Sequence, residues 1–285
     1  MLRFAGVIVV VFLAIDAAAS VNRPIADIGV FLDQCPDRDP AYTQIRADFE
    51  IRRGGVVVGT VPCTEPVSAM PVAQYTDELI ILQGLRVIYY MDRGQSGHLP
   101  WTAGTLYDWM KSKIVGIDIV TGYSFCCEVF GTPPPFPPPP TPPPPRLFIA
   151  VGAEDDFNRE FDKGWRGIAG NIGLYAHETR HVDGFPHSSC CGISGGCDNV
   201  FDPANLTPYG TQWWLHKLWL DGTINVGFEC ATPRTVSETA FWFVTDLNDQ
   251  YRTRFCRDLP SLVQAPAIPF GACVDIPPRR RAVRK

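Results

Sequence analysis

The spacing of apolar and polar residues along the chain predicts a mixture of strands and helices. Residues 49–61 carry β-branched side chains on both sides of the pair Gly54-Gly55, a pattern that predicts a β-hairpin. Short apolar runs at residues 115–120 and 147–151 predict two further strands, since runs of this length are typical of strands buried in a sheet.

Longer segments show the apolar spacing of buried helices. Thr76 followed by two acidic residues predicts a helix start, because a threonine side chain accepts a hydrogen bond from an amide of the first turn. In the helix predicted over residues 168–182, Gly170 and Gly173 weaken the first turns and would permit close packing against the sheet. We predict helices over residues 76–91, 105–113, 168–182, 209–220 and 237–247. Together with the strands they predict an α+β fold.

Three of the five histidines fall within residues 177–187, which read H-E-x-x-H-x-x-G-x-x-H without a mismatch. His177 and His181 are four positions apart, so on a helix both imidazoles lie on one face and can bind one cation. Glu178 lies one step round the helix, where its carboxylate is free to hold a water molecule.

The remaining positions of the string supply a third ligand. Gly184 follows the last predicted turn, where a left-handed residue commonly ends a helix and reverses the chain. That reversal would bring back His187 as a third nitrogen donor. Three protein ligands with one open position are typical of catalytic zinc, whereas structural zinc usually has four.

Residues 177–187 resemble the zinc-binding string of the metzincin clan of metallopeptidases, within the wider zincin group. The resemblance implies a zincin-like fold, in which a mixed sheet and an active-site helix precede a mainly helical, disulfide-stapled C-terminal lobe. It also implies a zinc endopeptidase. The clan's methionine turn has no counterpart, since the four methionines of this chain all precede the string.

This pattern predicts metal-assisted hydrolysis. Zn²⁺ held by His177, His181 and His187 would lower the pKa of its water to about 7, and Glu178 would act as general base. Asp183 or Asp198 is a candidate to orient a ligand imidazole, and Tyr209 is a candidate to stabilise a developing oxyanion, although a packed core tyrosine is the simpler interpretation. A glutamate replaces the third histidine in related zincins, which makes Glu238 the fallback ligand. One of Cys190, Cys191 and Cys197 is a further alternative ligand.

The N-terminus predicts export. A basic start, an apolar run at residues 4–15 and the small residues 17–19 fit a secretory signal peptide over residues 1–19, with an uncleaved anchor as the alternative. Ten cysteines agree with an oxidising extracellular or periplasmic compartment, where an even number is most simply interpreted as disulfides. No later stretch is apolar enough to predict stable membrane insertion.

Proline and charge divide the rest of the chain. Residues 132–145 form a proline-rich linker or loop. It separates a predicted N-terminal lobe, residues 20–131, from a predicted zinc-binding lobe, residues 146–275. The alternative role of this stretch is to bind a proline-recognising partner. Residues 276–285 form a basic tail. The net charge is -5, and without the five cations of the tail the body carries -10, which argues against a nucleic-acid partner.

The sequence therefore predicts a secreted zinc metallopeptidase with a peptide or protein substrate. Two other classes stay open: a disulfide-rich module in which the zinc is only structural, and a zinc amidase that acts on a non-protein substrate.

Overall fold

The computed structural model describes residues 28–91, 99–102, 104–121, 144–151, 165–187, 198, 205–220, 247 and 255. The predicted signal peptide, the basic tail and nearly all of the proline-rich stretch lie outside these described residues. So does the predicted helix over residues 237–247, apart from the helical Leu247.

A four-stranded mixed sheet forms the base of the described fold, in the order β2-β1-β3-β4. The antiparallel hairpin of β1 (Glu50–Arg53) and β2 (Val56–Val57) turns through the predicted glycine pair. Strand β3 (Gly116–Thr121) pairs in parallel with β1 and with β4 (Leu147–Val151). The predicted hairpin and both predicted strands are confirmed.

The four predicted helices that fall within the described residues are confirmed. Thr76 and Thr105 cap α3 and α4 by accepting hydrogen bonds from Leu79 N at 3.4 Å and Asp108 N at 3.1 Å. Helix α6 begins at Trp165, earlier than the predicted residue 168, and two helices before the sheet were not predicted. The helices are α1 (Ile28–Leu32), α2 (Tyr42–Asp48), α3 (Asp77–Tyr90), α4 (Leu106–Lys113), α6 (Trp165–Val182) and α7 (Pro208–Leu220).

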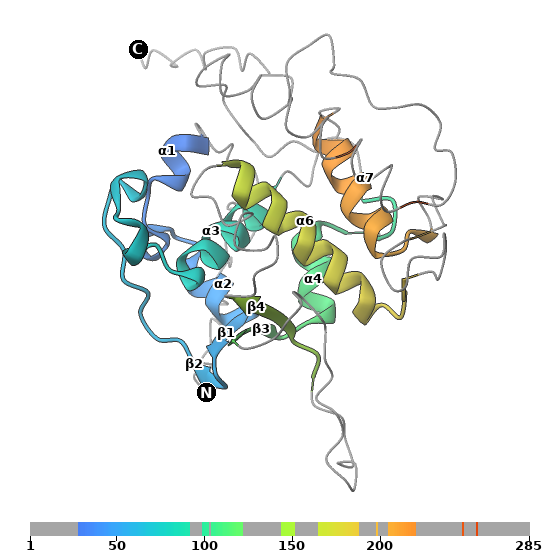
Figure 1. The fold of residues 1–285 in the computed structure, drawn as a ribbon, viewed down its shortest axis with the longest axis horizontal. Coiled ribbons are helices and arrows are strands. Elements are labelled where there is room, and N and C mark those ends of the chain that lie inside the picture. Colours follow the sequence, from blue (N-terminus) through green and yellow to red (C-terminus); the bar gives the residue numbers. More distant parts are fainter. Residues whose placement is uncertain are drawn as a thin grey trace, which may run out of the picture.

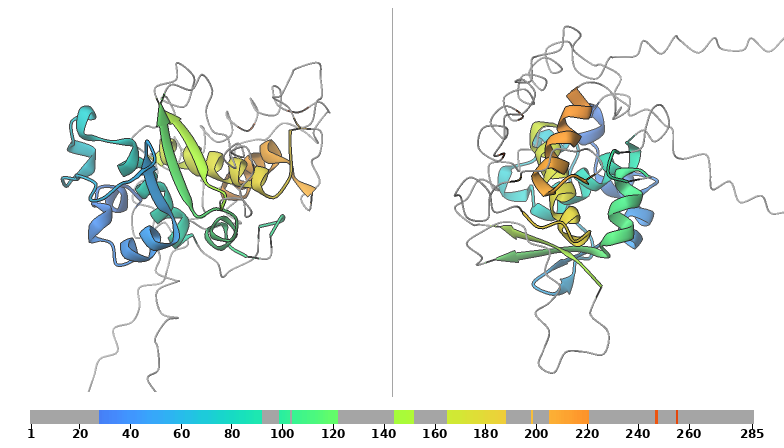
Figure 2. Two further views of the ribbon diagram at one scale, coloured as in Figure 1. Left: turned by 90° about the horizontal axis from the view of Figure 1, so that it is seen from below. Right: turned by 90° about the vertical axis from the view of Figure 1, so that its right-hand side faces the viewer.

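Helices α3, α4 and α6 lie on one side of the sheet (Figures 1 and 2). The strand register lines up Ile117 with Leu147 and Ile119 with Ile149, and all four side chains are fully buried. The alternate residue Asp118 is only half-buried, so the aliphatic face is the one that the helices cover. Burial of each such side chain contributes about 1.5–3 kcal/mol, and this core fixes the position of α6 above the sheet.

Helix α7 packs on α6 at a point where α6 has no side chain. A Cβ built on Gly173 would lie 2.3 Å from Nε2 of His216, a buried residue of α7. The glycine was predicted to permit close packing against the sheet; that prediction was wrong about the partner, because the close approach is to α7. The missing side chain lets the two helices come together, which matters because both helices carry residues of the predicted histidine site.

The N-terminal part is held by a disulfide and a buried ion pair. Cys35 and Cys63 are bonded, and both precede the proline-rich stretch. Arg86 Nε donates to Asp39 Oδ2 at 2.9 Å with both side chains buried, and Tyr90 donates to the other carboxylate oxygen at 2.6 Å. The other eight cysteines, including those of the predicted disulfide-stapled C-terminal lobe, lie outside the described residues.

In the sequence, β3 precedes and β4 follows the proline-rich stretch, and the two strands are neighbours in one sheet. Elements from the predicted N-terminal and zinc-binding lobes thus share a single layer, while the lobe boundaries themselves stay a prediction. Among the described helices, none is both long and apolar enough to cross a membrane.

Candidate metal centre

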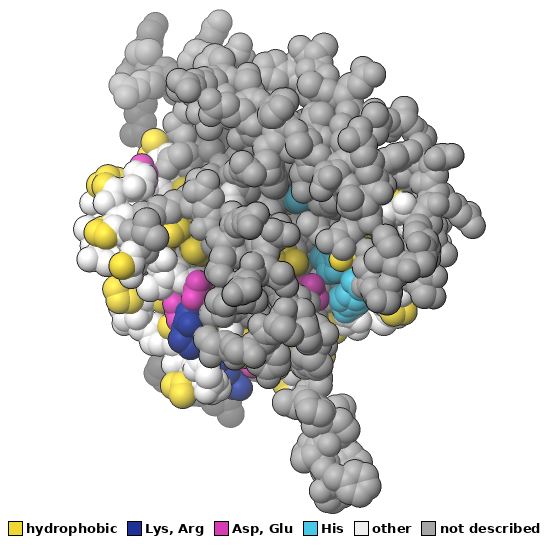
Figure 3. All heavy atoms as spheres, viewed as in Figure 1, with side chains coloured by type: hydrophobic (Ala, Val, Ile, Leu, Met, Phe, Trp, Pro, Cys, Tyr) yellow, Lys and Arg dark blue, Asp and Glu magenta, His cyan; other side chains and the backbone are white. Residues whose placement is uncertain are grey.

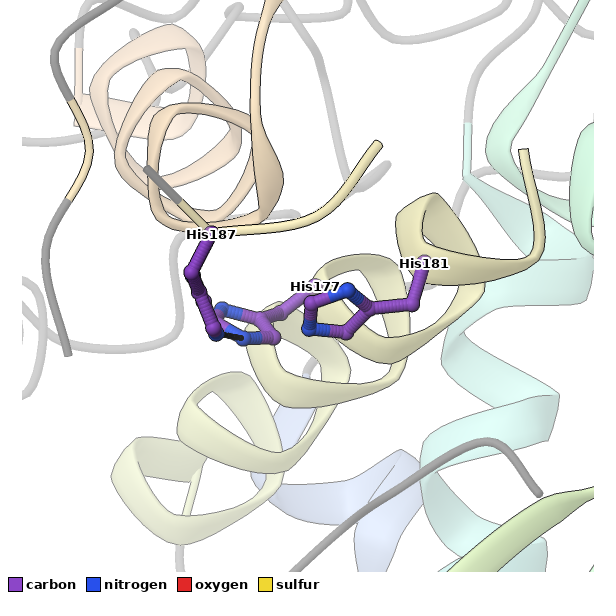
Figure 4. Close-up of side chains that lie close together, drawn as sticks. All are labelled: His177, His181 and His187. Carbon is purple, nitrogen blue, oxygen red and sulfur yellow. Dashed lines mark hydrogen bonds between the residues drawn. The ribbon is translucent and has the colours of Figure 1, made fainter. Parts of the chain in front are cut away.

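Two of the predicted ligands come from the last turns of α6. His177 and His181 are one helical turn apart, and their ring centroids are 5.3 Å apart. Their rings turn toward the same point beside the helix (Figure 4). The prediction that the two imidazoles share one face is confirmed.

The third histidine returns to this point through a tight turn. The Asp183 amide donates to Arg180 O at 3.1 Å and the Gly184 amide to His181 O at 2.9 Å. Gly184 has φ +85°, a left-handed conformation that lets the chain reverse after α6. His187 Nε2 then lies 3.3 Å from His177 Nε2.

The three imidazoles form a donor set that fits a metal ion. One nitrogen from each of His177, His181 and His187 lies within 4.8 Å of the other two. Two nitrogens that each lie 2.0–2.1 Å from a tetrahedral zinc are about 3.3–3.4 Å apart, and the His177–His187 separation matches this. The described residues therefore contain a histidine triad that could hold a metal ion.

The outer nitrogens of two rings have acceptors that fix their orientation. His181 Nδ1 lies 3.0 Å from the carbonyl oxygen of Phe185, and His187 Nδ1 lies 3.3 Å from Asp198 Oδ1. An Nδ1–H that donates to such an acceptor leaves Nε2 unprotonated, which is the form that binds a metal. Of the two acidic residues considered from the sequence, Asp198 is the one that contacts an imidazole of the triad.

Asp183 instead stabilises the turn after α6. Its Oδ2 accepts hydrogen bonds from Trp109 Nε1 at 2.8 Å and from Arg180 Nη1 at 3.1 Å, and Lys113 Nζ lies 2.5 Å from Oδ1. The Arg180 guanidinium also lies 3.6 Å from the centre of the Phe185 ring. This network ties the turn to α4 and holds the segment that leads to His187.

The Glu178 carboxylate lies next to one of the three imidazoles. Its side chain is almost fully buried, and its Oε1 is 3.8 Å from His177 Nε2. The carboxylate therefore lies beside the histidine cluster, and its predicted role in holding a water molecule stays a prediction.

Tyr209, in the first turn of α7, completes the wall of the site. Its ring stacks on His187 with centroids 4.5 Å apart and an interplanar angle of 25°, and it meets His177 edge to face at 4.5 Å. The sequence offered a packed core tyrosine as the simpler interpretation. The structure shows the ring packed against two imidazoles of the histidine cluster.

The local electrostatics favour the neutral form of His181. Burial and the neighbouring His187 ring lower the pKa of His181 below its ordinary value. At neutral pH His181 is thus in the form that can donate a lone pair to a metal.

The histidine cluster is partly exposed. The His187 side chain keeps 20 % of its surface exposed, and histidine side chains gather at one place on the face drawn in Figure 3.

The alternative ligands Glu238, Cys190, Cys191 and Cys197 lie outside the described residues. Comparison of the chain with protein-family models, with curated proteins and with solved structures finds no significant match.

Proposed function

We propose that this chain is a secreted zinc-dependent metallopeptidase with a zincin-like arrangement of sheet and active-site helix. One observation carries the proposal: three histidine nitrogens from α6 and the turn after it converge within 4.8 Å, with the Glu178 carboxylate 3.8 Å from one of them. Three neutral nitrogen donors with a neighbouring carboxylate are the set expected of a hydrolytic zinc site.

A zinc ion bound there would supply a water of lowered pKa and polarise the substrate carbonyl. Glu178 accepts the proton of the attacking water and delivers it to the leaving amine, a role that requires a carboxylate within reach of the metal. The near-complete burial of its side chain keeps bulk water from competing for the proton. Tyr209, whose ring lies against His177 and His187, is the candidate donor of a hydrogen bond to the developing oxyanion.

The architecture supports this role. Helix α6 lies on a mixed sheet and carries both the first two ligands and the base, so the catalytic groups stand on a rigid element. The apolar run at residues 4–15 and the Cys35–Cys63 disulfide support export to an oxidising compartment, where the substrate would be a peptide or protein.

The test combines metal analysis with digestion of a broad peptide library, with and without a chelator. We expect about one zinc per chain and peptide hydrolysis that the chelator abolishes. Glu178→Gln should keep the zinc and lose about 10²-fold or more in rate, because the amide cannot accept the proton. Glu50→Gln is the matched control, since Glu50 lies on β1 and contacts Arg146 and Arg52.

The outcomes separate the three classes. Full activity in Glu178→Gln would refute the proposed base. Zinc binding without hydrolysis of any peptide would indicate a structural metal. Chelator-sensitive hydrolysis confined to a cell-wall or small-molecule amide would indicate an amidase instead of a peptidase.

A further inference from the structure

Asp198 is a fully buried carboxylate whose two oxygens serve different parts of the metal centre. Oδ1 lies 3.3 Å from His187 Nδ1. Oδ2 accepts a hydrogen bond from the Tyr209 amide at 2.7 Å and a longer one from the Gly210 amide at 3.4 Å. One side chain thus connects the third ligand with the start of α7.

Both connections are physically favourable. A buried carboxylate is costly unless it is well hydrogen-bonded, and the amides in the first turn of a helix have no partners within the helix. The positive end of the dipole of α7, a 13-residue helix, further stabilises the negative charge. Asp198 therefore caps α7 in space although it lies ten residues before it in the chain.

The other oxygen decides which nitrogen of His187 carries the proton. His187 Nε2 faces His177 Nε2, so it can bind a metal only if it is unprotonated. The proton must then be on Nδ1, the atom that faces Asp198. A carboxylate has no proton to donate and can only accept, so it stabilises the tautomer that binds the metal.

We infer that Asp198 is a positioning residue that holds His187 in its metal-binding tautomer and couples this ligand to the first turn of α7. Because Tyr209 belongs to that turn and stacks on His187, ligand and helix end form one unit. Metal binding and order at the start of α7 are then linked. The inference rests on the metal-binding part of the proposed function and does not depend on hydrolysis.

The decisive variant is Asp198→Asn, which keeps the size of the side chain. Its amide oxygen can still accept from Tyr209 N, but its amide group then presents N–H to His187 Nδ1 and favours the wrong tautomer. We expect the dissociation constant for zinc, measured by competition with a chromogenic chelator, to rise about 10- to 100-fold. The matched control is Asp118→Asn, a part-buried carboxylate that accepts from Arg146 on the sheet; it should leave zinc affinity unchanged.

A second measurement reports the tautomer directly. In metal-free protein labelled with ¹⁵N-histidine, the ring nitrogen shifts of His187 should show Nδ1–H in the wild type and in Asp198→Glu, and Nε2–H in Asp198→Asn. Hydrogen exchange should show that zinc protects the Tyr209 amide in the wild type and protects it much less in Asp198→Asn.

These readouts keep the inference separate from the proposed function. If the wild type binds no zinc, the proposed function fails, and the wild-type ring shifts still test the hydrogen bond to Asp198. If zinc binds but the wild-type His187 carries its proton on Nε2 before the metal is added, the inference is overturned even where Asp198→Asn does not fold. Equal weakening in Asp198→Asn and Asp198→Glu with no change of tautomer would show a packing role alone and would also overturn it.

Discussion

Replacing Gly184 with alanine tests the turn that brings the third histidine to the site. Gly184 has φ +85° and no atom within 4 Å of the place where a Cβ would be, so the substitution introduces backbone strain without a clash. A left-handed alanine costs about 1–2 kcal/mol. The smaller entropy of the unfolded alanine chain offsets about 0.4–1 kcal/mol of this. We expect a net loss of about 1 kcal/mol in the free energy of unfolding.

The structure also predicts whether this loss appears in the stability of the metal-free protein or in the affinity for zinc. The turn is held without a metal by two backbone hydrogen bonds and by the contacts of Asp183 with Trp109, Arg180 and Lys113. The strain should therefore lower the stability of the metal-free protein and leave zinc affinity nearly unchanged. If the turn formed only with the metal, the same loss of about 1 kcal/mol would instead weaken zinc binding about fivefold.

The assay is urea unfolding in the presence of a chelator, followed by a zinc titration of each variant. Gly59→Ala is the control, because that glycine has neither a positive φ nor a neighbour within 4 Å, and it should be neutral or slightly stabilising. Gly184→Asn should lose less than Gly184→Ala, since asparagine tolerates the left-handed region. Wild-type stability in Gly184→Ala together with unchanged zinc affinity would refute the left-handed turn.

Two further predictions concern the support of the site. Gly173→Ala should destabilise the protein by about 1 kcal/mol, because overpacking against His216 costs about 1–3 kcal/mol while the higher helix propensity of alanine offsets about 1 kcal/mol. Thermal unfolding measures the loss. The additional substitution His216→Ala in the same chain should remove much of the clash and so recover much of the stability. Burial is the largest single effect on the pKa of Glu78 and raises it, but the hydrogen bonds from Arg53, from a backbone amide and from Thr76, together with the charge of Arg53, outweigh burial and leave the pKa below the ordinary value. Glu78 therefore stabilises the fold above about pH 4.5, its unfolded value, and this contribution is lost as the pH falls through the folded pKa. Unfolding at about pH 6 and about pH 3.5 should show a deficit in Glu78→Gln that shrinks in acid; an equal deficit at both would contradict the shift.

The sequence predicted the elements whose signals are local. Thr76 and Thr105 mark helix starts because their side chains cap the amides that follow, and the spacing of His177 and His181 is a property of any helix. Helix α2 has no such signal: its N-cap residue is Ala41, which makes no side-chain hydrogen bond, and Ile45 is its one buried residue. Its formation depends on packing that no short window of sequence contains.

The site was predictable up to the point where distant segments meet. The motif indicated His177, His181 and His187, yet it did not distinguish Asp183 from Asp198 as the partner of an imidazole. That choice depends on where the chain returns before α7. The contact of Tyr209 with His187 depends in the same way on how α7 docks against α6 at Gly173, a position where the sequence indicated the wrong partner.

The pairing of β3 with β4 has a consequence for dividing the protein. All three histidines and Glu178 follow the proline-rich stretch, whereas the strand beside β4 and the helices α3 and α4 that pack on α6 precede it. A fragment that starts after the stretch would contain the whole histidine motif but lack the strand and the two helices against which β4 and α6 pack. Two fragments cut there should recover a metal site only on mixing, so the cut site offers a natural place to build a split, reconstitutable form of the protein.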